Sequence, residues 1–177
     1  MNMMLSRLFW GAFLVSASCV GGLEAEPSGT NLALGKRYTL SPEPDYTLTV
    51  SAADSRKLTD GKRAEDGAFH VQPERTVGWG VGQVRIVVDL EEIQPIKTVH
   101  FSTVTQQNVE MPLPWLTVAA SDDGDRYHLV GHSNGLASPR VDKPGEVRRI
   151  LEVTGLQTRA RHVALLVRTS GWYIFGD

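Results

Sequence analysis

The chain has 177 residues, of which 41% are hydrophobic and 21% are charged, a composition typical of one ordinary globular domain. Its formal net charge is −2 and its pI is near 6.2, so no broad basic surface is available to neutralise phosphates. We therefore expect no nucleic-acid partner.

The first residues have the pattern of an export signal. Arg7 precedes an apolar run, LFWGAFLVSASCV, which is too short to span a bilayer comfortably and is followed by small residues. Cleavage after Ala25 would make residues 1–25 a signal peptide and residues 26–30 a linker. In an alternative, Cys19 becomes a lipid-modified N-terminus, although Ser16 stands where a lipobox normally has leucine. Either way, we expect a secreted, periplasmic or cell-surface protein whose mature chain has no transmembrane span.

Residues 31–177 predict a succession of short strands. Prolines punctuate a loop around Tyr46, and residues 48–50 predict a short strand. Trp79 ends a long polar loop and is expected in the core. The clearest strand follows, with an alternating apolar face made of Val84, Ile86, Val88 and Leu90. Residues 96–104 predict the next strand, and because only EEIQP separates the two, we expect them to be neighbours in one sheet.

The second half of the chain continues in the same way. Residues 115–121 and 126–133 predict a hairpin around Asp122-Asp123-Gly124-Asp125, in which the glycine supplies the positive φ. Residues 147–153, 161–167 and 172–177 predict three more strands. The expected inward residues of these segments include Val99, Phe101 and Thr103, then Leu116, Val118 and Ala120, then Val163, Leu165 and Val167. Many short strands without a helical period predict an all-β fold, an antiparallel β-sandwich.

The sequence lacks the spacing that catalysis would need. His128 and His132 are four residues apart in a predicted strand, a separation of about 13 Å, so one ion cannot bridge them. The segment GWGVGQ has no lysine and precedes a strand, unlike a phosphate loop, and there is no GxSxG elbow. Asp122 and Asp123 are adjacent, whereas glycoside hydrolysis needs two carboxyls facing one bond at about 5 to 9.5 Å. We therefore expect that the protein is not an enzyme.

Eight segments, taken in order, resemble the discoidin or coagulation factor 5/8 type C family. They are NLALGKRYTLSPEPDYTLT, LTDGK, TVGW, QVRIVVDL, PIKTVHFST, SDDGDRYHLVG, RHVALLV and GWYIF. The resemblance covers residues 31–177 and implies a galactose-binding-like jelly roll, especially similar to bacterial carbohydrate-binding modules attached to secreted polysaccharide-degrading enzymes. It implies a carbohydrate partner and a fused or associated glycoside hydrolase. A structural or adhesion domain at the cell surface, and the N-terminal fragment of a larger glycoside hydrolase, stay open as alternatives.

The resemblance also implies a structural calcium ion as cofactor. Its ligands would be the Leu58 carbonyl, the Asp60 carboxylate, the Lys62 carbonyl and Thr76. Oxygen-bearing side chains beside glycines suit a hard cation, although a solvated surface loop has the same composition. Family members continue past the last strand with a glutamate that completes the shell, whereas this sequence ends at Asp177. Calcium is therefore bound weakly or not at all, or the domain is truncated at its C-terminal strand.

The expected sugar site lies in loops at one end of the sandwich, because such loops vary without disturbing the core. The residues expected to gather there are Tyr46, Gln107, Asn108, Arg168 and Trp172. A ring would stack on the apolar face of a pyranose, the amides would pair with its hydroxyls, and the guanidinium would add donors.

Overall fold

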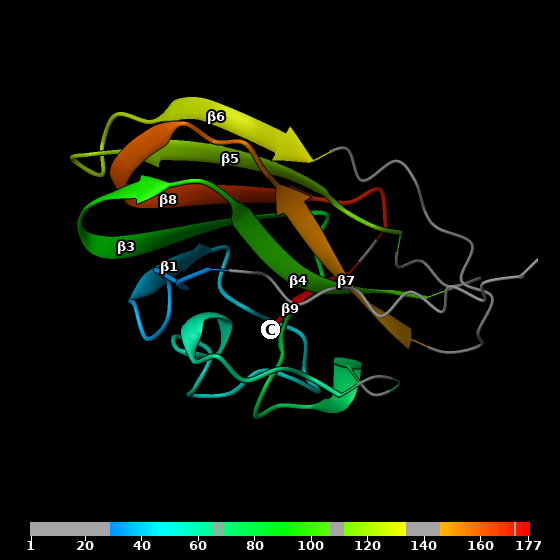
Figure 1. Cartoon of the computed structure of the whole chain (residues 1–177). Coiled ribbons are helices and arrows are strands. Elements are labelled where there is room, and N and C mark those ends of the chain that lie inside the picture. The colour runs from blue at the N-terminus through cyan, green and yellow to red at the C-terminus, as the bar shows by residue number, and fades with distance from the viewer. Residues whose placement is uncertain (1–28, 66, 68, 107–111, 134–145, 172) are drawn as a thin grey trace, which may run out of the picture.

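A computed structural model describes residues 29–65, 67, 69–106, 112–133, 146–171 and 173–177 (Figure 1). In these residues the regular structure is strand, apart from two short 3-10 turns, η1 (Lys57–Thr59) and η2 (Phe69–Val71). No helix within the described ranges is long and apolar enough to cross a membrane. The all-β prediction is confirmed.

The larger sheet contains five strands in the order β1-β3-β8-β5-β6, each antiparallel to its neighbours. Their bounds are β1 (Tyr38–Ser41), β3 (Gln83–Ile96), β8 (Thr158–Arg168), β5 (Trp115–Ser121) and β6 (His128–Ser133). The predicted hairpin is confirmed, since β5 pairs with β6 and Gly124 in the intervening turn has φ of +83°. The central strand, β8, lies between β3 and β5, which both come earlier in the chain.

Two strand pairs pack against one face of this sheet (Figure 1). The pairs are β4 (Val99–Gln106) with β7 (Glu146–Val153), and β2 (Val77–Trp79) with β9 (Ile174–Gly176). Side chains from both pairs share one hydrophobic core with those of β3, β5 and β8. The sandwich prediction is thus confirmed.

The core contains the predicted inward faces. The residues of the larger sheet that are at most 7% exposed include Val84, Ile86, Val88, Leu90, Leu116, Val118, Ala120, Val163, Leu165 and Val167. Phe101 and Thr103 are 5% and 1% exposed, and Trp79 is fully buried with its indole N–H donating to the Pro42 carbonyl at 3.0 Å. Burying each large apolar side chain stabilises the fold by roughly 1.5 to 3 kcal/mol.

The expected pairing of the two strands joined by EEIQP is wrong. Those residues do not form a connection, because β3 continues through them and pairs with β8 as far as Ile96. The register shifts between Asp89 and Gln94, where Glu91 adopts φ of +72° and donates its N–H to the Asp89 carboxylate at 2.8 Å. The next strand, β4, then pairs with β7 in the other layer.

The short strand predicted at residues 48–50 is also wrong. The N–H groups of Thr49 and Val50 both donate to the Tyr46 carbonyl, at 3.0 and 2.9 Å, so this segment closes a local turn. Leu48 and Val50 are 50% and 47% exposed. Their apolar character therefore does not mark a core strand.

Candidate functional site

Several loops meet at the end of the sandwich where β3 and β5 begin and β8 ends. We call this surface the loop end, which comprises residues 42–50, 80–82, 112–114, 169–171 and 173. The Gly80 N–H donates to the Asp45 carboxylate at 2.7 Å, which joins the first two loops. Thr169 links the others, because its N–H donates to the Gly82 carbonyl at 2.9 Å and its hydroxyl to the Pro112 carbonyl at 3.4 Å.

Tyr46 lies at the loop end and packs against rings near the last strand. Its ring meets Phe175 edge-on at 5.0 Å between centroids and Tyr173 at 5.4 Å. Its N–H donates to the Gly78 carbonyl at 3.2 Å, which ties the loop to β2. Burial raises the pKa of the Tyr46 hydroxyl, and Tyr173 and Glu146 raise it further, so the phenol is a neutral hydrogen-bond donor.

Arg168 ends β8 at the same surface. It is exposed, and it lies opposite Gln83 of β3 and Trp115 of β5. Trp115 is 37% exposed because the neighbouring Leu116 takes the inward position. Trp115 was not among the predicted site residues, although the alternation of β5 already predicts that its side chain faces away from the core.

Gln107, Asn108 and Trp172, the other predicted sugar-binding residues, lie outside the described residues. Their roles stay predictions. The residues on either side of position 172, Gly171 and Tyr173, are described. The Thr169 hydroxyl accepts a hydrogen bond from the Gly171 N–H at 3.1 Å.

Near the implied calcium loop, the Thr76 hydroxyl and one carboxylate oxygen of Asp177 are buried without a hydrogen-bond partner among the described residues, and the neighbouring groups make the following contacts. The Thr76 carbonyl accepts a hydrogen bond from the Lys57 ammonium at 3.0 Å. The Asp60 carboxylate accepts the Lys62 N–H at 2.8 Å, and the Leu58 N–H donates to the Tyr38 hydroxyl at 3.1 Å. Among the described residues, no group of three or more His, Cys, Asp or Glu side chains is arranged to hold a metal.

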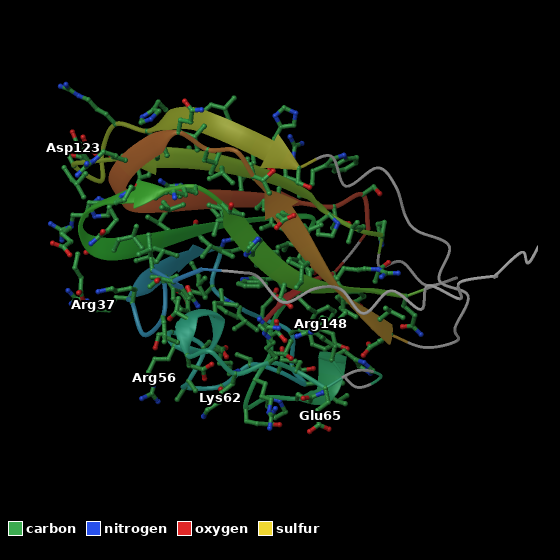
Figure 2. All side chains as sticks on the ribbon, viewed as in Figure 1. Arg37, Arg56, Lys62, Glu65, Asp123 and Arg148 are labelled. Carbon is green, nitrogen blue, oxygen red and sulfur yellow. The ribbon has the colours of Figure 1, made fainter. Side chains whose placement is uncertain are left out.

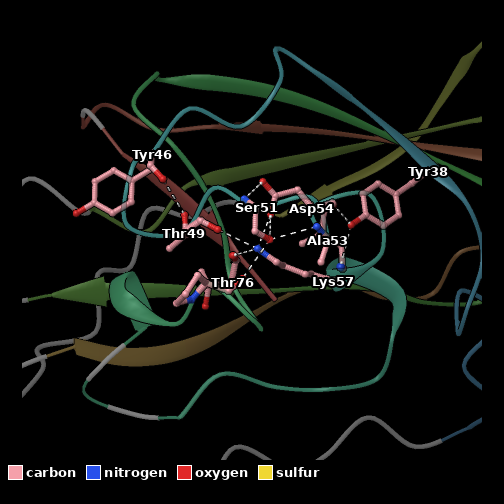
Figure 3. Close-up of polar contacts among 10 residues, drawn as sticks. Tyr38, Tyr46, Thr49, Ser51, Ala53, Asp54, Lys57 and Thr76 are labelled. Atoms are coloured by element: carbon pink, nitrogen blue, oxygen red, sulfur yellow. Dashed lines mark hydrogen bonds and ion pairs between the residues drawn. The ribbon is translucent and has the colours of Figure 1, made fainter.

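The Lys57 ammonium lies at the centre of a buried polar cluster (Figure 3). It donates to the Thr49 carbonyl at 2.9 Å, to the Thr76 carbonyl and to the Asp54 carboxylate. Lys57 is only 1% exposed, and these three bonds use all three ammonium protons. The Asp54 carboxylate balances this buried positive charge. Calcium stays a prediction.

No protein-family model and no curated protein sequence matches this sequence. Many solved structures do, among them the following three. The lectin domain of lectinolysin, complexed with Lewis B antigen, has a TM-score of 0.56 and 18% identity, covering 83% of this chain and 92% of that chain. A fucose-binding module of Streptococcus pneumoniae has a TM-score of 0.54 and 19% identity, covering 86% and 94%. The Clostridium perfringens module CpGH89CBM32-5, in complex with GalNAc-β-1,3-galactose, has a TM-score of 0.52 and 15% identity, covering 80% and 91%.

The likeness to these structures concerns the fold. It extends over most of this chain and nearly the whole of each module, and it agrees with the ordered segments that resemble the discoidin family. The chain therefore has the galactose-binding-like β-sandwich fold of these carbohydrate-binding modules.

Proposed function

We propose that the domain binds carbohydrate at the loop end without acting on it chemically. The observation that carries this proposal is the packed pair of rings, Tyr46 and Tyr173, at the same end of the sandwich as Arg168 and Trp115, which lie opposite each other in β8 and β5. Tyr173 is 41% exposed and Trp115 is 37% exposed, while Tyr46 is half-buried against Tyr173. The fold shared with modules that were solved with bound glycans supports the same proposal.

The chemistry of these groups suits a sugar. A pyranose presents apolar C–H faces that can stack on Tyr173 or Trp115, while its hydroxyls can pair with the Arg168 guanidinium and the exposed Asp45 carboxylate. The predicted residues Gln107, Asn108 and Trp172 would add to this set. A shallow, solvated site of this kind predicts weak affinity, with a Kd on the order of 0.1 to 1 mM.

The test is a glycan and polysaccharide binding screen on the purified protein, with fucose-, galactose- and N-acetylgalactosamine-terminated glycans among the probes. We expect a binder whose affinity falls roughly 10-fold or more in Trp115→Ala, Tyr173→Ala or Trp172→Ala. Leu129→Ala is the matched control, because Leu129 is 65% exposed on β6 and lies outside the loop end.

Two outcomes would contradict the proposal. A binder whose affinity is unchanged in all three ring variants would place the site on another surface. The absence of any binder would favour the structural or adhesion domain instead.

We further infer that the protein is exported and acts beside a glycoside hydrolase. The support is the leader pattern of residues 1–25, which lie outside the described residues, and the resemblance to modules attached to such enzymes. Cell fractionation followed by N-terminal analysis tests the export step. A mature chain that begins at Glu26 is expected, a lipid-modified Cys19 would support the alternative anchor, and retention of the leader in the cytoplasm would contradict export.

A further inference from the structure

Two exposed arginines occupy neighbouring positions on the outer face of the larger sheet, the face turned away from the core, where it borders the loop end. Arg85 of β3 lies opposite Leu166 of β8, and Arg168 comes two residues later on β8. The adjacent Val84 and Val167 are fully buried, so both arginine side chains point away from the core. The α-carbons of such diagonal neighbours are about 7 to 8 Å apart.

Neither arginine forms an ion pair with an acidic side chain among the described residues. Arg161, which also belongs to β8, does form one, with Asp89. The Arg85 guanidinium instead lies over the Tyr127 ring, 4.9 Å from its centroid, a contact that does not neutralise its charge. Two neighbouring cations repel each other unless an anion neutralises them, so this pair favours an acidic ligand.

The groups beside Arg168 suit the sugar part of such a ligand. Trp115 lies opposite Arg168 on β5, and Gln83 lies opposite it on β3. All three side chains are exposed, so a pyranose that stacks on the Trp115 ring has an amide and a guanidinium within the same row. A guanidinium matches the geometry of a carboxylate or similar oxyanion through two parallel N–H bonds.

We propose that the glycan bound at the loop end is acidic, and that its carboxylate or sulfate groups pair with Arg168 and, in a longer chain, also with Arg85. The binding of a glycan rests on the proposed function, whereas the preference for an acidic one is added by the two arginines.

The outer face gives a longer chain a path from one arginine to the other. The row next to Arg168 contains Arg85, Leu166 and Thr117, which lie opposite one another on β3, β8 and β5. Leu166 and Thr117 are half-buried and uncharged. Neither row therefore places an acidic side chain between the two guanidiniums, and a second acidic group on the chain meets Arg85 without repulsion.

The first test compares acidic polysaccharides with neutral forms of the same backbone. The probes are polygalacturonate with its methyl ester, and a sulfated galactan with its desulfated form, so the two arms identify the acidic group. We expect one acidic probe to bind roughly 10-fold or more tightly than its neutral form. Its affinity should fall as NaCl is raised from about 50 to about 500 mM, because salt screens exposed charges.

Two outcomes of this test would overturn the proposal. Equal affinity for acidic and neutral forms, or binding of neutral glycans only, would overturn the acidic preference and leave carbohydrate binding intact. Binding of no glycan in either this test or the wider screen would overturn it together with the proposed function.

The second test removes single charges. We expect Arg168→Gln to lower the affinity for the acidic probe roughly 10-fold and to change the affinity for a neutral glycan much less. Arg85→Gln should weaken the binding of a long acidic chain more than that of a short oligomer. Arg37→Gln is the matched control, because Arg37 is exposed and lies with Asp123 at the end of the sandwich opposite the loop end (Figure 2).

Thermal melts show whether these variants keep the fold. Because the substituted side chains are exposed, the Tm should change by no more than about 2 °C. Arg168→Lys keeps the charge but loses the planar fork, so its affinity should lie between those of the unchanged protein and Arg168→Gln. Equal affinities of Arg168→Gln and Arg37→Gln for the acidic probe would overturn the proposal, as would an Arg168→Gln loss that is the same for acidic and neutral glycans.

Discussion

Tyr38 ties β1 to the segment of residues 54–58 through a single hydroxyl group. The O–H donates to the Asp54 carbonyl, and the oxygen accepts the Leu58 N–H at 3.1 Å. Burial raises the pKa of Tyr38 to about 12, so the hydroxyl keeps its proton throughout the physiological range. The phenol is thus a structural link between β1 and the segment that contains Lys57.

Tyr38→Phe should lower the free energy of unfolding by about 1 to 3 kcal/mol, because the Asp54 carbonyl and the Leu58 N–H lose their partner. Urea unfolding measures this change. Tyr127→Phe is the control. It also removes a phenol hydroxyl, but it keeps the ring over which the Arg85 guanidinium lies, 4.9 Å from the ring centroid. A similar loss in both variants would show that the Tyr38 hydroxyl has no special role.

Gly78 occupies a position where no side chain fits. A β-carbon there would lie 2.6 Å from the Thr49 hydroxyl and 2.8 Å from the Phe175 ring. Gly78→Ala should therefore destabilise the fold by about 1 to 3 kcal/mol and displace the loop that carries Tyr46. Gly80→Ala provides the comparison, because the nearest atom to its β-carbon is an Asp45 oxygen at 3.6 Å. Equal stability of the two variants in urea unfolding would contradict the packing argument.

At the scale of the elements, β3 pairs with β8 along most of its length, and the register of this pairing shifts between Asp89 and Gln94. At that stretch Arg161 of β8 donates two hydrogen bonds to the Asp89 carboxylate, at 2.8 and 2.9 Å. These hydrogen bonds hold the pKa of Asp89 well below its usual range. The ionised carboxylate therefore links the two strands where their register shifts.

This lowered pKa predicts a pH dependence of stability. A carboxyl whose pKa is lower in the folded state stabilises the fold above its unfolded pKa of about 3.9, and this contribution is lost as the pH falls through the lower, folded value. Asp89→Asn should lower the Tm at pH 7 by roughly 2 to 4 °C, a modest change because water screens the partly exposed pair. The difference from the unchanged protein should shrink steadily below pH 4 in thermal melts. A difference that is equal at pH 7 and pH 2 would contradict the ion pair.

Most strands were predictable from the sequence, although β1 and β2 were not predicted, whereas strand pairing was only partly predictable. The alternation in β3, β5 and β8 predicts which residues are buried, because a period of two follows directly from strand geometry. It does not predict which sheet a strand joins, and β4 pairs with β7 instead of β3. At residues 48–50 the sequence predicted a strand that does not exist. The segment forms a turn instead, because the Tyr46 carbonyl accepts the N–H groups of both Thr49 and Val50.

The residues at and near the candidate site were also only partly predictable from the sequence. Tyr46 and Arg168 were predicted from the sequence and do lie at one end of the sandwich, because loops that follow alternate strand ends must meet there. Lys57 could not be predicted as a buried residue. Its burial depends on carbonyls of Thr49 and Thr76, which are distant in sequence and carry no side-chain signal.

At the scale of the whole molecule, one shared core supports two ends of different character. The loop end gathers rings and polar groups, whereas the opposite end holds the compact Asp122–Asp125 turn between β5 and β6 (Figure 1). The strands between them are held by the buried core, so the loops rest on a rigid support. This arrangement favours recognition at the loop end over recognition on the strand faces.

The most direct test of carbohydrate binding at the loop end is an NMR titration of the isotope-labelled protein with a glycan found in the binding screen. Backbone amide shifts should change at residues 42–50, 80–82, 112–115 and 168–173, while those of the Asp122–Asp125 turn stay constant. Saturation of these changes with a Kd on the order of 0.1 to 1 mM is the predicted result. Shift changes confined to the opposite end, or to the outer faces of the strands, would contradict the proposed site.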